Sequence, residues 1–155
     1  MSMKLSNEVV ELLNGKQLNE KQDLAMMLQS VTEDGYPHTA MVSVGEVVAV
    51  NSEQLRIALW PDTKTTNSLI KLKKASLVIV HNHKVNYIEL DVNFMAQIQI
   101  DSFERACFEA NVKSFKEDVA KYADIDTGIT ITLKDPEDVL QRWRTTIDRL
   151  LEVSN

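Results

Sequence analysis

The segment LRIALWPDTKTTNSLIKLKKASLVIVH, residues 55–81, decides the fold of this chain. Its two ends, residues 55–60 and 75–81, are short apolar runs that predict β-strands. The polar stretch between them predicts a helix at residues 63–74, which Thr63 or the aspartate before it can cap. We therefore expect a strand, a helix and a second strand in succession.

Further strands, joined by turns, are predicted on both sides of this segment. Residues 25–31 form an apolar strand, the sequence EDGYP at 33–37 forms a turn, and residues 38–50 form a long β-branched strand. That strand is interrupted at Gly45, where we expect a bulge or a tight bend. Residues 90–101 alternate apolar and polar side chains, which predicts a strand with one buried face.

Helices are predicted near both ends of the chain. Ser6 can cap a short helix that ends near Gly15. Residues 102–122 carry apolar side chains at helical spacing and predict an amphipathic helix, which residues 127–133 follow as a β-branched strand. The last helix is expected at 135–151, because its opening Asp-Pro pair fits the N-cap and the first helical position.

The predicted elements amount to about six strands, with helices at both ends and one helix between strands. This order fits a mainly β fold with helices, an antiparallel barrel, better than a parallel sheet of alternating strands and helices. We expect one domain over residues 1–155. It would comprise a helix and lead-in at 1–23, a barrel core at 24–101, and a helix, a strand and a C-terminal helix at 102–155.

Composition excludes several classes of function. The chain has 155 residues, of which 44% are hydrophobic, and 17 Lys and Arg against 23 Asp and Glu give a net charge of −6. This balance argues against nucleic-acid and anionic-membrane partners, which need clustered basic residues. No apolar run approaches the roughly 20 residues of a membrane-spanning helix. Without a secretory leader, and with Cys107 as its one cysteine, the protein is expected in the cytoplasm.

The start of the helix predicted at residues 63–74 is the strongest candidate site. Three hydroxyls and one ammonium gather there, on Thr63, Lys64, Thr65 and Thr66. The first turn of a helix also offers free N–H groups and the positive end of the helix dipole, so this composition suits a phosphate group. The alternative interpretation is a helix capped by Thr63 whose other polar groups face solvent.

Other polar residues are given simpler interpretations. His81 and His83 lie two residues apart and could hold a metal with a third ligand such as His38, but a turn with exposed imidazoles is favoured and no metal is expected. Cys107 is interpreted as a buried thiol rather than a nucleophile. The polar face of the strand at 90–101, which includes two glutamines, could contact a ligand or water.

The order of these short motifs resembles the pyridoxamine 5'-phosphate oxidase superfamily, whose members are split β-barrels that bind flavin mononucleotide (FMN). The resemblance covers roughly residues 24–100 and rests on the motifs at 35–38, 55–60, 63–69 and 76–80. It implies an antiparallel split barrel, FMN as the cofactor, and a homodimer with the cofactor at the subunit interface. The C-terminal helix, with its apolar stripe, could then pack on its own barrel or on the partner subunit.

The resemblance also implies which residues contact the cofactor. The residues that match the stretches along the flavin ring are Met41, Val42, Ser43, Leu59 and Trp60. The phosphate-binding triplet of the superfamily matches Thr63, Lys64 and Thr65, with Thr66 as an added donor. One of the two cations of that triplet is absent, which implies weaker binding of the phosphate. No side chain is assigned a catalytic role, because the flavin would carry the chemistry.

Departures from the superfamily pattern limit the expected reaction. Two cations of true pyridoxamine phosphate oxidases match Ala40 and Gly45 here, and their arginine-bearing C-terminal strand has no counterpart. Oxidation of vitamin B6 is therefore not expected, and we expect a small FMN-dependent oxidoreductase acting on an unknown small molecule. The alternative is a split barrel that lacks the cofactor, or holds it without turnover, and serves as a binding or stress-related accessory protein. The deazaflavin coenzyme F420 or a haem in the same groove is less favoured.

Overall fold

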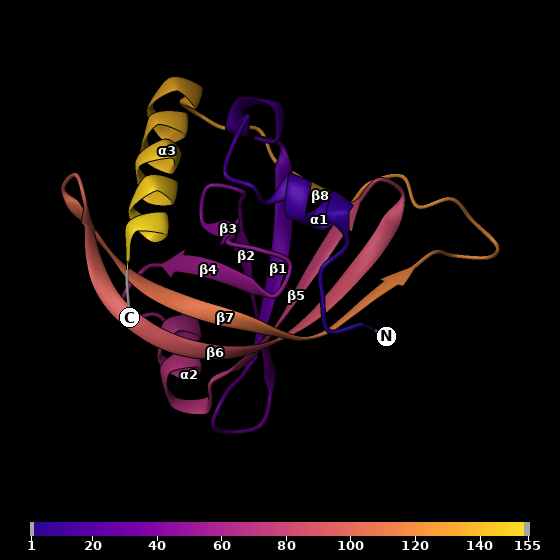
Figure 1. Cartoon of the computed structure of the whole chain (residues 1–155), viewed down its shortest axis with the longest axis horizontal. Coiled ribbons are helices and arrows are strands. Elements are labelled where there is room, and N and C mark those ends of the chain that lie inside the picture. The colour runs from indigo at the N-terminus through magenta and orange to yellow at the C-terminus, as the bar shows by residue number, and fades with distance from the viewer. Residues whose placement is uncertain (1, 154–155) are drawn as a thin grey trace.

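The computed structural model describes residues 2–153 and contains one continuous antiparallel sheet. The strands are β1 (Leu24–Val31), β2 (Pro37–Val42), β3 (Val47–Ala49), β4 (Gln54–Leu59), β5 (Lys74–His81), β6 (Lys84–Ile100), β7 (Phe103–Asp118) and β8 (Ile129–Thr130). The helices are α1 (Asn7–Leu12), a 3-10 turn η1 (Leu18–Glu20), α2 (Lys64–Leu72) and α3 (Pro136–Glu152). Seven strands follow the order β2-β1-β5-β6-β7-β4-β3, and β8 pairs with β1 (Figure 1). The mainly β fold with helices, an antiparallel split barrel, is confirmed.

The three helices begin where the capping residues predict. The Ser6 hydroxyl accepts a hydrogen bond from the Val9 amide at 3.3 Å, and Asp135 accepts one from the Asp138 amide at 3.4 Å. Thr63, the N-cap of α2, accepts one from the Thr66 amide at 3.1 Å. Each cap satisfies an N–H group that the helix itself leaves without a partner.

The helix predicted at residues 102–122 is wrong, because this segment forms β7. The strand pairs with β6 from Phe103 to Asp118 and with β4 on its other side. Residues 105–108 are all buried, so the alternation that identifies a strand is hidden at this point. The two-residue turn at 101–102 joins β6 and β7 in a hairpin, and this pairing outweighs the helical spacing of the alanines.

Two predicted strands are shorter than expected. The strand at 127–133 is reduced to β8, two exposed residues that pair with Leu24 and Ala25 at the edge of β1. The strand at 38–50 divides into β2 and β3 around a turn in which the Glu46 amide donates to the Ser43 carbonyl. The predicted interruption at Gly45 is therefore confirmed as a turn between two strands.

The alternating strand β6 begins at Lys84, earlier than predicted, and its register shifts between Phe94 and Ala96. Phe94, which lies at this shift, is 43% exposed, although the alternation places it on the buried face. On either side of the bulge the pattern holds, since Leu90, Val92, Ile98 and Ile100 are buried.

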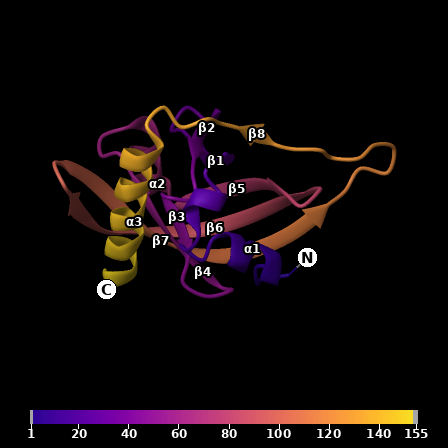
Figure 2. The same cartoon turned by 90° about the horizontal axis from the view of Figure 1, so that it is seen from above.

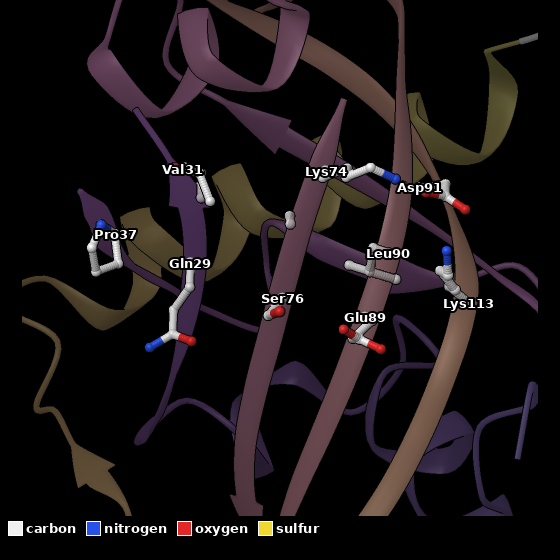
Figure 3. A pocket seen from close by; sticks show the side chains of 11 residues that line it. Gln29, Val31, Pro37, Lys74, Ser76, Glu89, Leu90, Asp91 and Lys113 are labelled. Atoms are coloured by element: carbon white, nitrogen blue, oxygen red, sulfur yellow. Dashed lines mark hydrogen bonds and ion pairs between the residues drawn. The ribbon is translucent and has the colours of Figure 1, made fainter. Parts of the chain in front are cut away.

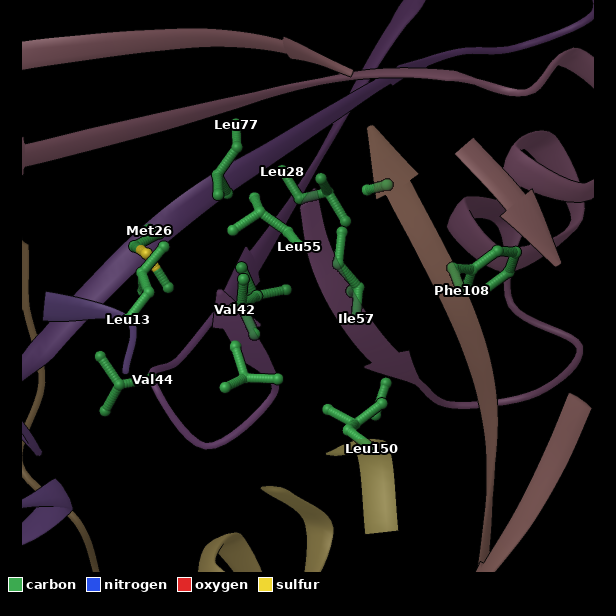
Figure 4. Close-up of a cluster of buried hydrophobic side chains, with 14 of the residues drawn as sticks. Leu13, Met26, Leu28, Val42, Val44, Leu55, Ile57, Leu77, Phe108 and Leu150 are labelled. Carbon is green, nitrogen blue, oxygen red and sulfur yellow. The ribbon is translucent and has the colours of Figure 1, made fainter. Parts of the chain in front are cut away.

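Side chains from the strands fill the core, and helices close it. Figure 4 shows Leu28, Val42, Leu55, Ile57 and Leu77 together, with Leu13 and Leu150 from the two ends of the chain. The apolar stripe of α3, Leu140, Trp143, Ile147 and Leu150, is buried against β3, β4 and β6 (Figures 1 and 2). The stripe therefore packs on its own barrel. Within residues 2–153, no helix combines the length and the apolar character that crossing a membrane requires.

Candidate functional site

The junction between β4 and α2, residues 60–66, is held together by its own hydroxyls. The Thr66 hydroxyl donates to the Trp60 carbonyl at 2.6 Å, and the Thr63 hydroxyl lies 3.1 Å from that of Thr66. Asp62 takes the left-handed conformation at φ 62°, which turns the chain sharply from strand to helix. Thr65 and Thr66 are buried. The Thr66 hydroxyl therefore uses its proton in the hydrogen bond to the Trp60 carbonyl and has none left for a ligand. The backbone amides of Lys64 and Thr65, in contrast, have no hydrogen-bond partner among residues 2–153.

Lys64 projects beside a hollow of about 330 Å³ between α2 and the turn that joins β1 to β2. Asn67 and Ser68 line it from the helix, and Glu33 and Asp34 line it from the turn. A hydrogen bond from the Thr32 hydroxyl, with smaller contributions from the Tyr36 backbone and the Lys64 charge, holds the pKa of Asp34 below its usual range. The hollow therefore combines the Lys64 ammonium with two carboxylates, of which Glu33 also pairs with Lys71 at 2.6 Å.

Of the residues predicted to line a flavin from the long strand, only Met41 lies at the surface. Its side chain is 59% exposed, while Val42 and Ser43 are buried. The Ser43 amide and hydroxyl both donate to one carboxylate oxygen of Glu46, at 2.9 and 2.8 Å. Burial raises the pKa of Glu46, and these hydrogen bonds partly offset that rise. Ser43 thus fixes the turn after β2 and keeps its hydroxyl away from the surface.

Trp60 stands half exposed at the end of β4 and contacts β7. The residue is 51% exposed, the Arg105 guanidinium lies 3.6 Å from the ring centroid, and Phe103 packs edge-on at 5.7 Å. Leu59 is buried and pairs with Ala106, which is why Arg105 lies beside Trp60. Sequence reasoning missed Arg105 because its segment was expected to be a helix. The alternating face of β6 could have identified a hairpin partner there.

The structure joins the predicted site residues into two groups. Trp60 and residues 63–66 form one hydrogen-bonded unit, and Met41 lies on β2, which α2 contacts. Within the described residues, no hydrogen bond links residues 41–43 to the junction. The exposed side chains that a ligand could reach are therefore Met41, Trp60 and Lys64.

Gly45 is required by the packing of α3. A Cβ atom at Gly45 would lie 2.0 Å from the Trp143 ring, so no side chain fits at this position. Trp143 belongs to the stripe that fastens α3 to the barrel, so a side chain at position 45 would push this helix away.

A second hollow, of about 360 Å³, opens where β1 and β5 separate beyond the pair Gln29 and Ser76. Figure 3 shows Gln29, Ser76, Glu89 and Lys113 in a row across four strands. Lys74 and Asp91 form an ion pair of 3.1 Å at its rim. None of the predicted site residues lines this hollow, and no group of three or more metal-binding side chains occurs among the described residues.

Comparison with solved structures shows a shared fold. The "putative pyridoxamine 5'-phosphate oxidase" of Lactobacillus delbrueckii superposes with a TM-score of 0.56 at 15% identity, over 74% of this chain and 95% of that one. HupZ of Group A Streptococcus superposes with a TM-score of 0.57 at 10% identity, over 80% and 99% of the two chains. The fold is therefore that of the pyridoxamine 5'-phosphate oxidase-like, FMN-binding split barrels.

Sequence comparison places the chain more narrowly. It is 41% identical to the uncharacterized protein YclD of Bacillus subtilis over 146 residues, which cover 94% of this chain and 95% of YclD. No family model matches the sequence. The chain belongs to the family of YclD.

Proposed function

We propose that this protein binds FMN at the β4–α2 junction and that the bound flavin transfers electrons to or from a small molecule. The observation that supports this most strongly is the start of α2. There Lys64 lines a hollow beside the positive end of a nine-residue helix, and the amides of Lys64 and Thr65 have no partner among the described residues. The split-barrel fold supports the proposal independently.

The residues at the junction fit a flavin phosphate. Lys64 would pair with the phosphate, while the amides of Lys64 and Thr65 would donate to its oxygens. Thr63 and Thr66 hold the turn by hydrogen bonds that leave these two amides without a partner. Trp60 and Met41 would lie against the ring, which supplies the redox chemistry when bound. Asp34 opposes the phosphate by charge repulsion, so we expect modest affinity.

A lysine substitution tests the phosphate site. We expect Lys64→Ala to weaken FMN binding by about tenfold, because it removes a charge-assisted contact. Lys64 is exposed, so the melting temperature of the flavin-free protein should not change. Lys116→Ala removes an exposed lysine of β7 that does not line the hollow; it is the control and should alter FMN affinity less than about twofold. Equal loss of affinity in both variants would contradict the proposed site.

The acidic side of the hollow gives a second test of the same site. Asp34→Asn removes a carboxylate whose low pKa keeps it ionised at neutral pH. We expect FMN binding to strengthen by roughly threefold at low salt and by less at about 0.5 M salt, because surface charges are screened there. Fluorescence titration at both salt concentrations measures the effect. Unchanged affinity at low salt would place the phosphate away from Asp34.

We also propose that the active species is a homodimer with the flavin at the subunit interface. Three large apolar side chains near the site, Met41, Trp60 and Phe94, are between 43% and 59% exposed in the single chain. Contact with a second subunit would remove them from water. Sedimentation or gel filtration coupled to light scattering measures the mass, and a monomer at micromolar concentration would contradict this part of the proposal.

A further inference from the structure

Two arginines from different elements converge on the aromatic side chains beside the β4–α2 junction. Arg105 of β7 lies over the Trp60 ring at 3.6 Å and 5.5 Å from the centroid of Phe103. Arg142 of α3 lies 5.7 Å from the centroid of the same Phe103 ring. We call these four residues, Trp60, Phe103, Arg105 and Arg142, the arginine–aromatic cluster.

Arg105 carries hydrogen-bond donors that the protein does not use. The residue is only 7% exposed, yet its guanidinium makes one hydrogen bond, to the Glu104 carbonyl at 2.9 Å. Among the described residues, the fully buried side-chain atoms without a partner are the Ser30 hydroxyl and the Arg56 Nε. The remaining Arg105 nitrogens therefore still reach solvent, and they are available to a ligand.

The charge of the cluster is not balanced by close carboxylates. Arg105 has no acidic group within 4.0 Å among residues 2–153, and Arg142 has only the exposed Asp138 on its own helix, at 3.8 Å. The carboxylate of Glu46 lies near both arginines. It accepts hydrogen bonds from Ser43, however, and forms no ion pair with either arginine. Two guanidiniums thus face a single carboxylate at longer range, which leaves a net positive charge.

We propose that Arg105 and Arg142 bind the carboxylate of a small ligand whose apolar body lies against the exposed Phe103, beside Trp60. A guanidinium presents paired N–H groups that match a carboxylate, and an aromatic wall selects a ligand with an apolar portion. This inference deepens the proposed function, on which it rests, by naming small organic carboxylates as the substrate class. The connection is Trp60, whose carbonyl is bound by Thr66 of the junction.

Calorimetric titration with benzoate tests the carboxylate site directly. Benzamide has the same ring without the charge and serves as the control ligand. We expect benzoate to bind with a Kd in the order of 1 mM and benzamide to bind at least about tenfold more weakly. The titration is performed on the protein both without and with added FMN. Benzoate binding without any FMN binding would contradict the flavin proposal and leave the carboxylate site standing.

Substitutions assign the binding to the cluster. Arg105→Gln should weaken benzoate binding at least about tenfold, and Arg142→Gln about threefold. Arg144→Gln removes an exposed arginine of the same helix and should change the affinity less than about twofold. Because Arg105 is buried, Arg105→Lys keeps the charge if the glutamine variant fails to fold, and it should still weaken binding by losing the paired N–H groups. Equal affinity for benzoate and benzamide, or affinity unchanged in the folded Arg105 and Arg142 variants, would overturn the inference.

Discussion

Glu46 illustrates how a single residue near the site responds to its surroundings. Its carboxylate accepts two hydrogen bonds from Ser43, and its side chain lies close enough to Arg105 and Arg142 for their charges to favour ionisation. Burial nevertheless dominates, so the pKa lies above the ordinary value of 4.5. The folded protein therefore binds a proton at Glu46 more tightly than the unfolded chain does.

This shift predicts how stability depends on pH. As the pH rises above the pKa that Glu46 has in the unfolded chain, its ionisation begins to destabilise the native state. The destabilisation is complete above the higher pKa that Glu46 has in the folded protein. Glu46→Gln still accepts the hydrogen bonds from Ser43 and cannot ionise. The free energy of unfolding of the variant relative to wild type should therefore increase between about pH 4 and pH 8. Urea denaturation at each pH measures it.

Glu104→Gln, the same substitution at an exposed side chain, is the control for this comparison. A relative stability of Glu46→Gln that stays constant or falls with rising pH would show that the folded protein does not raise the pKa of Glu46, and that the Ser43 hydrogen bonds and the arginine charges outweigh burial.

Residue-level reasoning from the sequence succeeded where a side chain acts on its near neighbours along the chain. The capping roles of Ser6, Thr63 and Asp135 follow from local hydrogen bonds and are confirmed. Arg105 could not be recognised, because Trp60 and Arg142 lie far from it in the sequence, and the same distance separates Glu46 from the two arginines whose charges act on it. Their positions depend on the pairing of β4 with β7 and on the docking of α3.

At the scale of elements, α3 is fastened to the barrel by contacts at two places. Trp143 occupies the space above Gly45, and Arg56 of β4 donates to the carbonyls of Leu150 and Val153 at 2.7 and 2.6 Å. The first contact excludes a side chain at the turn after β2, and the second fastens the C-terminal end of the helix. Both contacts make α3 an integral part of the barrel.

Gly45→Ala should lower the free energy of unfolding by about 2 kcal/mol or more, because the added methyl group would overlap the Trp143 ring. Gly35→Ala is the matched control. Gly35 has φ +85° but no atom within 4 Å of a built Cβ, so its substitution should cost only about 1 kcal/mol of backbone strain. Denaturant melts compare the two, and an equal or larger loss in Gly35→Ala would contradict the steric role of Trp143.

Arg56→Met should destabilise the protein by about 2 kcal/mol, because two charge-assisted hydrogen bonds to helix carbonyls are lost. Amide hydrogen exchange should quicken in the last turn of α3 and remain slow in α2. The exposed Arg144→Met provides the control on the same helix. Equal exchange rates in the last turn of wild type and Arg56→Met would show that Arg56 does not hold the helix end.

The segment predicted as a helix at residues 102–122 forms the strand β7 because of its neighbours in the sheet. A strand covered on both faces has no alternation, and four successive buried residues at 105–108 leave helix and strand equally compatible with the pattern. Only the position of β7 between β6 and β4 decides the matter. The length of β8 is also decided by long-range pairing. Among the described residues it pairs only with Leu24 and Ala25 of β1, so it is two residues long.

For the whole molecule, the order of local signals was enough to predict the architecture. The β1–β2 turn, the strand β4, the start of α2 and the strand β5 follow one another as the resemblance implies, and the split barrel is confirmed. The extent of the β6–β7 hairpin could not be predicted, because it depends on long-range pairing. The hairpin supplies two of the four residues of the arginine–aromatic cluster.

The central claim is that this barrel binds FMN. The most direct measurement is the visible absorption spectrum of the purified protein after incubation with FMN and removal of free flavin by gel filtration. We predict that flavin absorbance elutes with the protein, in an amount approaching one FMN per chain. A protein peak without flavin absorbance, at protein concentrations well above micromolar, would contradict the claim and identify this chain as a split barrel that does not bind FMN.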